Sequence, residues 1–181
     1  MGSPRDVQRG VTRVESVSHF VNVAFAISVA VASTAASLAQ APVADPYGFD
    51  IEVALSPKAA AELAARHEQV TAYASYFGQP APGAEKHVDE VGQIDLANQT
   101  RTVAANSGAF HFDGPAIDPR RLALIDGTVM VNLNVASARK SSEDNLLACD
   151  FIQGALADVR KATITLHCGL ISEDPVTVVK P

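Results

Sequence analysis

Two H-x-D triplets are the residues whose types and spacing most directly offer chemistry, His87-Val88-Asp89 and His111-Phe112-Asp113. On a β-strand, residues two apart point to the same face, so each triplet would place an imidazole beside a carboxylate. Two such pairs on neighbouring strands would supply the nitrogen and oxygen ligands of a metal site, or the acid and base of a hydrolase. The ordinary alternative is that both pairs face solvent because the residues between them are buried.

We expect the ordinary alternative, because nothing in the spacing forces the two triplets onto adjacent strands. The loop before His87 is rich in Pro and Gly, and a predicted hairpin separates the two triplets. A transition-metal site needs three or four ligands held around one point. The prediction is therefore that His87, Asp89, His111 and Asp113 hold no metal and that the chain carries no cofactor, with a metal-binding protein or hydrolase as the alternative.

The sequence has no G-x-S-x-G signature of an activated serine and no glycine-rich loop that would bind phosphate. Its glycines are isolated turn markers. Ser141 follows Arg139-Lys140 in a polar stretch and is expected in a turn. These observations favour a protein that is not an enzyme.

Cys149 and Cys168 are the two cysteines of the chain. There is no C-x-x-C and no second pair, so a metal or redox role has little support. Two cysteines in an exported protein usually pair, and Cys168 falls on the apolar side of its predicted strand. We predict a structural disulfide between them. A symmetric hairpin centred on Asp158-Val159 would place them opposite each other, whereas a bond between two sheets is the other possibility.

The N-terminal segment has the pattern of an export signal. Three arginines precede an uncharged run from Phe20 to Ala41, and small residues end it at Ser37-Leu38-Ala39. We predict a signal peptide over residues 1–39, a linker over 40–48, and a mature protein that is periplasmic or secreted without stable membrane insertion. Retention of the segment as an anchor is the alternative, because its uncharged length could just span a bilayer.

The charge pattern argues against nucleic acid as a partner. The formal net charge is −6, and the basic residues form no cluster interleaved with aromatics. An acidic body repels phosphate backbones. The partner is expected to be a protein or a small ligand. The predicted role is that of a non-enzymatic binding, adaptor or structural module that acts through loops at one end of the domain.

Alternating apolar residues predict the fold class. Residues 128–135 place Val129, Val131, Leu133 and Val135 on one face, and residues 49–55, 109–113 and 163–168 alternate in the same way. With turn signals between them, about seven or eight strands are expected over residues 49–181. This pattern predicts an all-β fold, an antiparallel β-sandwich of immunoglobulin-like size, with an up-and-down barrel as the alternative.

Several local features complete the predicted domain. Ser56-Pro57 and Asp118-Pro119 each combine a capping side chain with proline at the first helical position, so a short helix is expected after each. Residues 93–96 and 101–104 flank Asn98-Gln99, which suggests a hairpin there. In the strand 69–77 the alternation is blurred, which suggests a bulge, and we expect its aromatic residues to pack in the core rather than form an exposed patch. Those residues are Tyr73, Tyr76 and Phe77.

Overall fold

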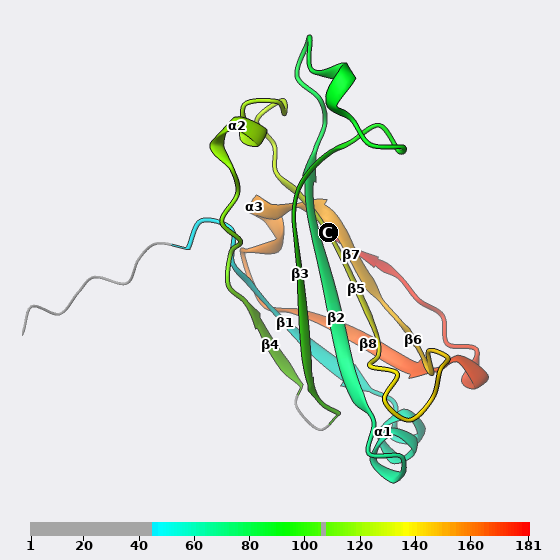
Figure 1. Cartoon of the computed structure of the whole chain (residues 1–181). Helices are drawn as coiled ribbons and strands as arrows, with labels where there is room; N and C mark the ends of the chain where they lie inside the picture. Colours follow the sequence, from blue (N-terminus) through cyan, green and yellow to red (C-terminus); the bar gives the residue numbers. More distant parts are fainter. Residues whose placement is uncertain (1–44, 106–107) are drawn as a thin grey trace, which may run out of the picture. The chain divides into compact units, whose positions relative to one another are not determined.

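The computed structural model describes residues 45–105 and 108–181, so the predicted signal peptide 1–39 lies outside the described residues. Of the predicted linker 40–48, residues 45–48 are described and form no strand or helix. In the described part, two β-sheets pack face to face around a hydrophobic core, with β2 and β3 in front of β1 and β4 in the view of Figure 1. The predicted all-β sandwich is confirmed, and the two separate sheets exclude the barrel alternative.

The first sheet has four strands in the order β4-β1-β8-β6. Its members are β4 (Ala109–Phe112), β1 (Phe49–Leu55), β8 (Ile164–Leu170) and β6 (Leu147–Cys149). The central pair β1 and β8 runs parallel, while the outer pairs are antiparallel.

The second sheet has five strands in the order β3-β2-β5-β7-β9. Its members are β3 (Ile94–Ala104), β2 (Gln69–Gly78), β5 (Met130–Ser137), β7 (Phe151–Ala155) and β9 (Val179–Lys180). All pairs are antiparallel except β7 with β9. Both sheets are therefore mixed, with parallel pairs that the sequence pattern did not indicate.

Short helices connect the strands where the capping signals predicted them. The Ser56 hydroxyl accepts from the Ala59 amide at 3.1 Å and begins α1 (Pro57–Ala65). The Asp118 carboxylate accepts from the Arg120 amide at 2.9 Å and begins α2 (Pro119–Leu122). The remaining helical segments are α3 (Leu156–Val159), η1 (Glu85–His87) and η2 (Ile171–Glu173). No helix in the described ranges is long and apolar enough to cross a membrane.

The core is built from the alternating residues of both sheets. Val131, Leu133 and Val135 of β5 are buried as predicted, and Val129 packs against the core just before the strand. Phe49 stacks on Phe112 with ring centroids 5.0 Å apart. Each fully buried side chain of this size contributes roughly 1.5–3 kcal/mol relative to leaving it in water, so this alternation is the main source of stability.

The predicted hairpin at Asn98-Gln99 is wrong, because β3 runs through these residues as one strand. Asn98 lies opposite Ser75 and Gln99 lies opposite Ala74 in the ladder with β2. Polar residues in the middle of a strand look like a turn when only the sequence is read. They are stable here because one face of β3 meets solvent, and a side chain on that face does not have to be apolar.

The suspected bulge lies in β3 and not in β2, because Tyr76 pairs with Ala97 and Phe77 pairs with Asp95, which leaves Leu96 without a partner, while β2 pairs with β5 without a break. The expectation that all three aromatic residues of β2 pack in the core holds for Tyr76, which is 0% exposed, whereas Phe77 is 7% exposed but lies outside the core cluster. It is wrong for Tyr73, which is 45% exposed. Tyr73 alternates with the buried residues Ala72 and Ala74, so the pleat turns it to the outer face.

Candidate functional site

Cys149 and Cys168 form the predicted disulfide, with Cα atoms 4.0 Å apart. They are direct partners in the antiparallel ladder of β6 and β8, so the bond lies within one sheet. The register is the one that a hairpin centred on Asp158-Val159 would give, but that hairpin does not form. Asp158 and Val159 belong to α3 and do not form a turn. Between Cys149 and α3 the chain passes through β7, which is in the other sheet.

Asp150 marks the point where the chain passes from the first sheet to the second. Its carboxylate accepts hydrogen bonds from the backbone amides of Val178 (2.9 Å) and His167 (3.2 Å), and Lys180 Nζ lies 3.5 Å away. Burial alone would raise the pKa of Asp150, but these hydrogen bonds and the lysine lower it below its ordinary value. Asp150 therefore works as a buried carboxylate that joins β6, β8 and the C-terminal strand.

The two H-x-D pairs do not come together as one site. His111 Nδ1 lies 2.7 Å from Asp50 Oδ1 on the neighbouring strand, and its Nε2 lies 3.4 Å from Asp113 Oδ1. The hydrogen bond with Asp50 raises the pKa of His111. His87 ends η1, in the connection between β2 and β3. No group of three His, Cys, Asp or Glu residues within 45–105 and 108–181 is arranged to hold a metal ion.

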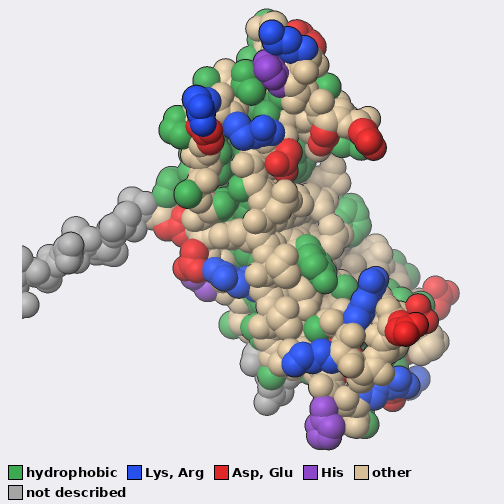
Figure 2. Space-filling view, viewed as in Figure 1, with side chains coloured by type: hydrophobic (Ala, Val, Ile, Leu, Met, Phe, Trp, Pro, Cys, Tyr) green, Lys and Arg blue, Asp and Glu red, His purple; other side chains and the backbone are tan. Residues whose placement is uncertain are grey.

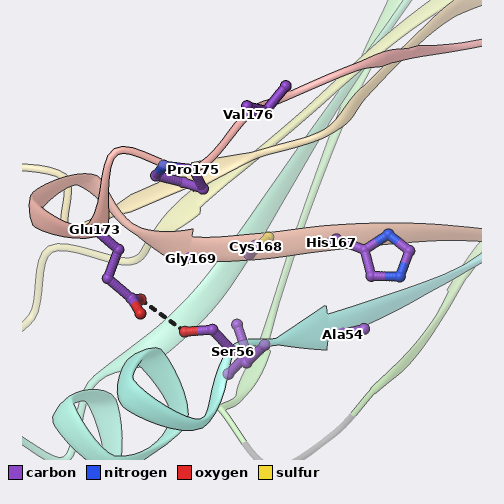
Figure 3. A pocket seen from close by; sticks show the side chains of 9 residues that line it. Ala54, Ser56, His167, Cys168, Gly169, Glu173, Pro175 and Val176 are labelled. Carbon is purple, nitrogen blue, oxygen red and sulfur yellow. Dashed lines mark hydrogen bonds between the residues drawn. The ribbon is translucent and has the colours of Figure 1, made fainter.

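A pocket of about 410 Å³ opens beside the disulfide, between the end of β1, β8 and the segment around Pro175 (Figure 3). The Ser56 hydroxyl donates to Glu173 Oε2 at 2.7 Å, and Figure 3 shows the His167 ring at the other end of the pocket. His167 Nδ1 lies 3.3 Å from Asp150 Oδ2, and its side chain is 70% exposed. The serine is thus engaged by a carboxylate and by the helix that it caps, rather than by the histidine.

The outer face of the five-stranded sheet carries a different arrangement, a row of polar side chains from four strands. Ser75 is the direct partner of Asn98 and Asn132, and Asn132 is the direct partner of Gln153. Direct partners in an antiparallel ladder point to the same face. Because Ala74 and Tyr76 point into the core, this row points outward.

Two further rows continue this face along the strands. Tyr73 is the direct partner of Thr100 and Asn134, and Thr71 is the direct partner of Thr102. The Thr71 and Thr102 hydroxyls lie 2.9 Å apart and share a hydrogen bond. We call these three rows the amide face, and they consist of Thr71, Tyr73, Ser75, Asn98, Thr100, Thr102, Asn132, Asn134 and Gln153.

Charged side chains are absent from the amide face. Arg101 lies between Thr100 and Thr102 on β3, so it points to the opposite side, where it pairs with Asp113. Figure 2 shows an uncharged area near the middle of this side of the molecule, with charged side chains above it, below it and along its left border. The face therefore offers hydrogen-bond donors and acceptors without a net charge.

A cavity of about 310 Å³ lies at one end of the amide face, under the loop that leads into β3. It is lined by Ser75, Asn98, Asn132 and Gln153 together with Phe77, Asp89, Gln93 and Asp95. The Asp89 carboxylate accepts from the amides of Val91 (3.0 Å) and Gln93 (2.9 Å), which holds the loop in a tight turn. A pocket with an aromatic residue and several convergent polar groups is the usual form of a small-ligand site.

The sequence predicts Tyr73 in the core and Asn98 in a turn, and it assigns no role to Asn132, Asn134 or Gln153. A signal was present, since Asn132 and Asn134 are the polar positions of a strongly alternating strand. What the sequence does not contain is the register that aligns them with Ser75, Asn98 and Gln153. Comparisons with protein-family models, curated protein sequences and solved structures found no match to this chain.

Proposed function

We propose that this chain is an exported, non-enzymatic binding module that acts in the periplasm or outside the cell. The proposal places the ligand on the amide face, with the adjoining cavity as the end of the site. The observation that carries it is the alignment of Asn98, Ser75, Asn132 and Gln153 in one row across four strands.

The composition of the face supports binding over simple solvation. Charged residues make up 19% of the chain, and a sheet face that only has to stay wet normally carries some of them. On the amide face every strand presents neutral donors and acceptors instead. Neutral amides and hydroxyls give up their water at a lower cost than charges do, so they suit a surface that is to be covered by a ligand.

The disulfide supports the exported location. A bond between Cys149 and Cys168 is compatible with an oxidising compartment, where such bonds form and persist. The predicted signal peptide supports the same location.

The pocket beside the disulfide is the place where a hydrolase alternative would have to act, and its geometry supports that activity less well. A serine nucleophile needs a base within hydrogen-bond reach that takes its proton. The Ser56 hydroxyl instead donates to Glu173 and accepts from the Ala59 amide. Its bonds are those of a helix cap, and they are complete without His167.

A thermal-shift experiment tests the proposal without a known ligand. The full chain, isolated from an exporting host, is mixed separately with neutral oligosaccharides, with short peptides and with nucleosides. A ligand that binds only the folded state raises the melting temperature. We expect a rise with one of the mixtures, and the rise should disappear in the Asn132→Ala, Gln153→Ala double variant.

The matched control is His111→Ala, which removes an exposed side chain from a strand of the other sheet. It should keep the ligand-dependent rise. A rise of equal size in the double variant, or no rise with any mixture, would contradict binding on the amide face.

A further inference from the structure

We infer that the amide face binds a neutral oligosaccharide. This inference rests on the proposed function and adds the chemical class of the ligand. It follows from the hydrogen-bonding capacity of the face, from the exposed ring of Tyr73, and from the charges that border the cavity.

The amide side chains match hydroxyl groups because each amide carries both a donor and an acceptor. Asn134 Nδ2 donates to Asn132 Oδ1 at 2.6 Å. This bond orients the two amides and leaves the Asn132 NH₂ group and the Asn134 carbonyl oxygen directed to other partners. A sugar hydroxyl donates one hydrogen bond and accepts others, so neighbouring hydroxyls of one ring can use both groups at once.

Tyr73 supplies an apolar surface at the centre of the face. Its ring is 45% exposed and is flanked in its row by Thr100 and Asn134, whose side chains are shorter. One face of a pyranose ring presents mainly C–H groups, and these pack on an aromatic ring. Tyrosine offers this contact area with little loss of conformational freedom, while Ser and Asn beside it provide adaptable hydrogen bonds.

The bordering charges exclude anionic ligands. Asp89 and Asp95 line the cavity at the end of the face, and no Lys or Arg lines it in the described part of the chain. A phosphate, a sulfate or a uronic acid placed there would meet two carboxylates and no cationic side chain among the lining residues. The ligand that fits is therefore uncharged.

The backbone of the two central strands of the face does not favour an extended peptide as the ligand. Peptides that add to a sheet use free N–H and C=O groups at an edge, with pockets for alternate side chains. The central strands β2 and β5 are paired on both sides, so their backbone groups are already used. What remains accessible over these central strands is side-chain hydrogen bonding, and the face spans four strands, roughly 14 Å from β3 to β7. That span suits a short oligosaccharide.

The test is calorimetric titration of the full chain with defined tetrasaccharides. Cellotetraose, mannotetraose and N-acetylchitotetraose are the neutral probes, tetragalacturonate is the anionic probe, and an uncharged tetrapeptide is the peptide probe. We expect at least one neutral tetrasaccharide to bind and tetragalacturonate not to bind.

Two substitutions and one control locate the binding. Tyr73→Ala and Asn132→Asp should each weaken the neutral tetrasaccharide on the order of tenfold, since each removes one contact but leaves the strand pairing intact. His111→Ala should leave the affinity unchanged. A peptide that binds the face when no tetrasaccharide does would overturn the ligand class while the proposed binding function stands. Saccharide binding that survives both substitutions would overturn the site.

Discussion

Ser75 on β2 and Asn132 on β5 are direct partners in an antiparallel ladder, and their side chains stand next to each other on the outer face of the five-stranded sheet. Asn98 and Gln153 extend the same row on either side. The ladder between the strands thus brings together polar residues from four parts of the chain. The proposed function depends on this alignment.

Removal of the disulfide should destabilise the domain without changing its fold. Replacing both Cys149 and Cys168 with Ala should lower the free energy of unfolding by about 3 kcal/mol, within a range of roughly zero to five. In the chain-entropy model the bond acts by restricting the unfolded chain, and β6 and β8 keep their ladder without it. Denaturant unfolding of the wild type and the double variant measures the difference.

The oxidation state in the native compartment is the companion measurement. Intact-mass analysis without reduction should show the loss of two hydrogens. Two free thiols that react with an alkylating reagent in protein isolated from that compartment would show that the bond has no role there.

The elements that the sequence predicted well are those with strong local signals. β1 extends over the predicted residues 49–55, and Ser56 caps α1 with the predicted hydroxyl. Both Phe110 and Phe112 point into the core. In each case the pattern lies within a few consecutive residues, and no distant partner is needed to interpret it.

The features that the sequence pattern did not predict depend on partners that are distant in the chain. The parallel pairing of β1 with β8 joins strands more than a hundred residues apart, and nothing in either strand specifies its direction relative to the other. Asn98-Gln99 resembles a turn until β2 is placed beside it. The rows of the amide face are missed for the same reason, because their alignment is a property of the register and not of any one strand.

Glu68 should make the stability of the fold depend on acid pH. Its buried carboxylate accepts hydrogen bonds from the Ser141 hydroxyl and from the amides of Ser141, Lys140 and Gln69. Burial alone would raise the pKa of Glu68, but these bonds lower it from 4.5 to about 2. Ser141, which the sequence predicted in a turn, therefore also links the loop after β5 to the start of β2 through its hydrogen bonds with Glu68.

Because folding favours the ionised form of Glu68, its contribution is present above the unfolded pKa of 4.5 and is lost as the pH falls through about 2. Glu68→Gln should lower the free energy of unfolding at pH 7 by roughly 1–3 kcal/mol and flatten its dependence on pH between these values. Unfolding measured from pH 7 to pH 2 provides the comparison. Glu143→Gln in the same loop is the control, and an equal effect there would rule out a specific role for Glu68.

Zinc should not stabilise the protein through the H-x-D pairs. His111 is paired with Asp50 and Asp113. In the part of the chain that the structure describes, no group of three His, Cys, Asp or Glu residues is arranged to hold a metal ion. Replacing His87 and His111 with Ala should each change the free energy of unfolding by no more than about 0.5 kcal/mol. Melting curves with and without zinc should coincide. A zinc-dependent rise that vanishes in the double variant would revive the metalloprotein alternative.

The mature chain should begin at or within a few residues of Gln40. Ser37 and Ala39 provide the small residues that signal peptidase requires before the cut. Mass spectrometry of the N-terminal peptide from protein expressed with its complete leader gives the answer. A membrane-bound chain that still begins at Met1 would identify the segment as an anchor.

The measurement that tests the binding proposal most directly is a nuclear magnetic resonance titration of the isotope-labelled full chain. The side-chain amide signals of Asn98, Asn132, Asn134 and Gln153 report on the amide face itself, and the backbone amides report on every other surface. When the oligosaccharide, peptide and nucleoside mixtures are added in turn, one of them should shift these four signals first. Shifts confined to the outer face of the four-stranded sheet, or to the pocket of Ser56 and His167, would contradict the account.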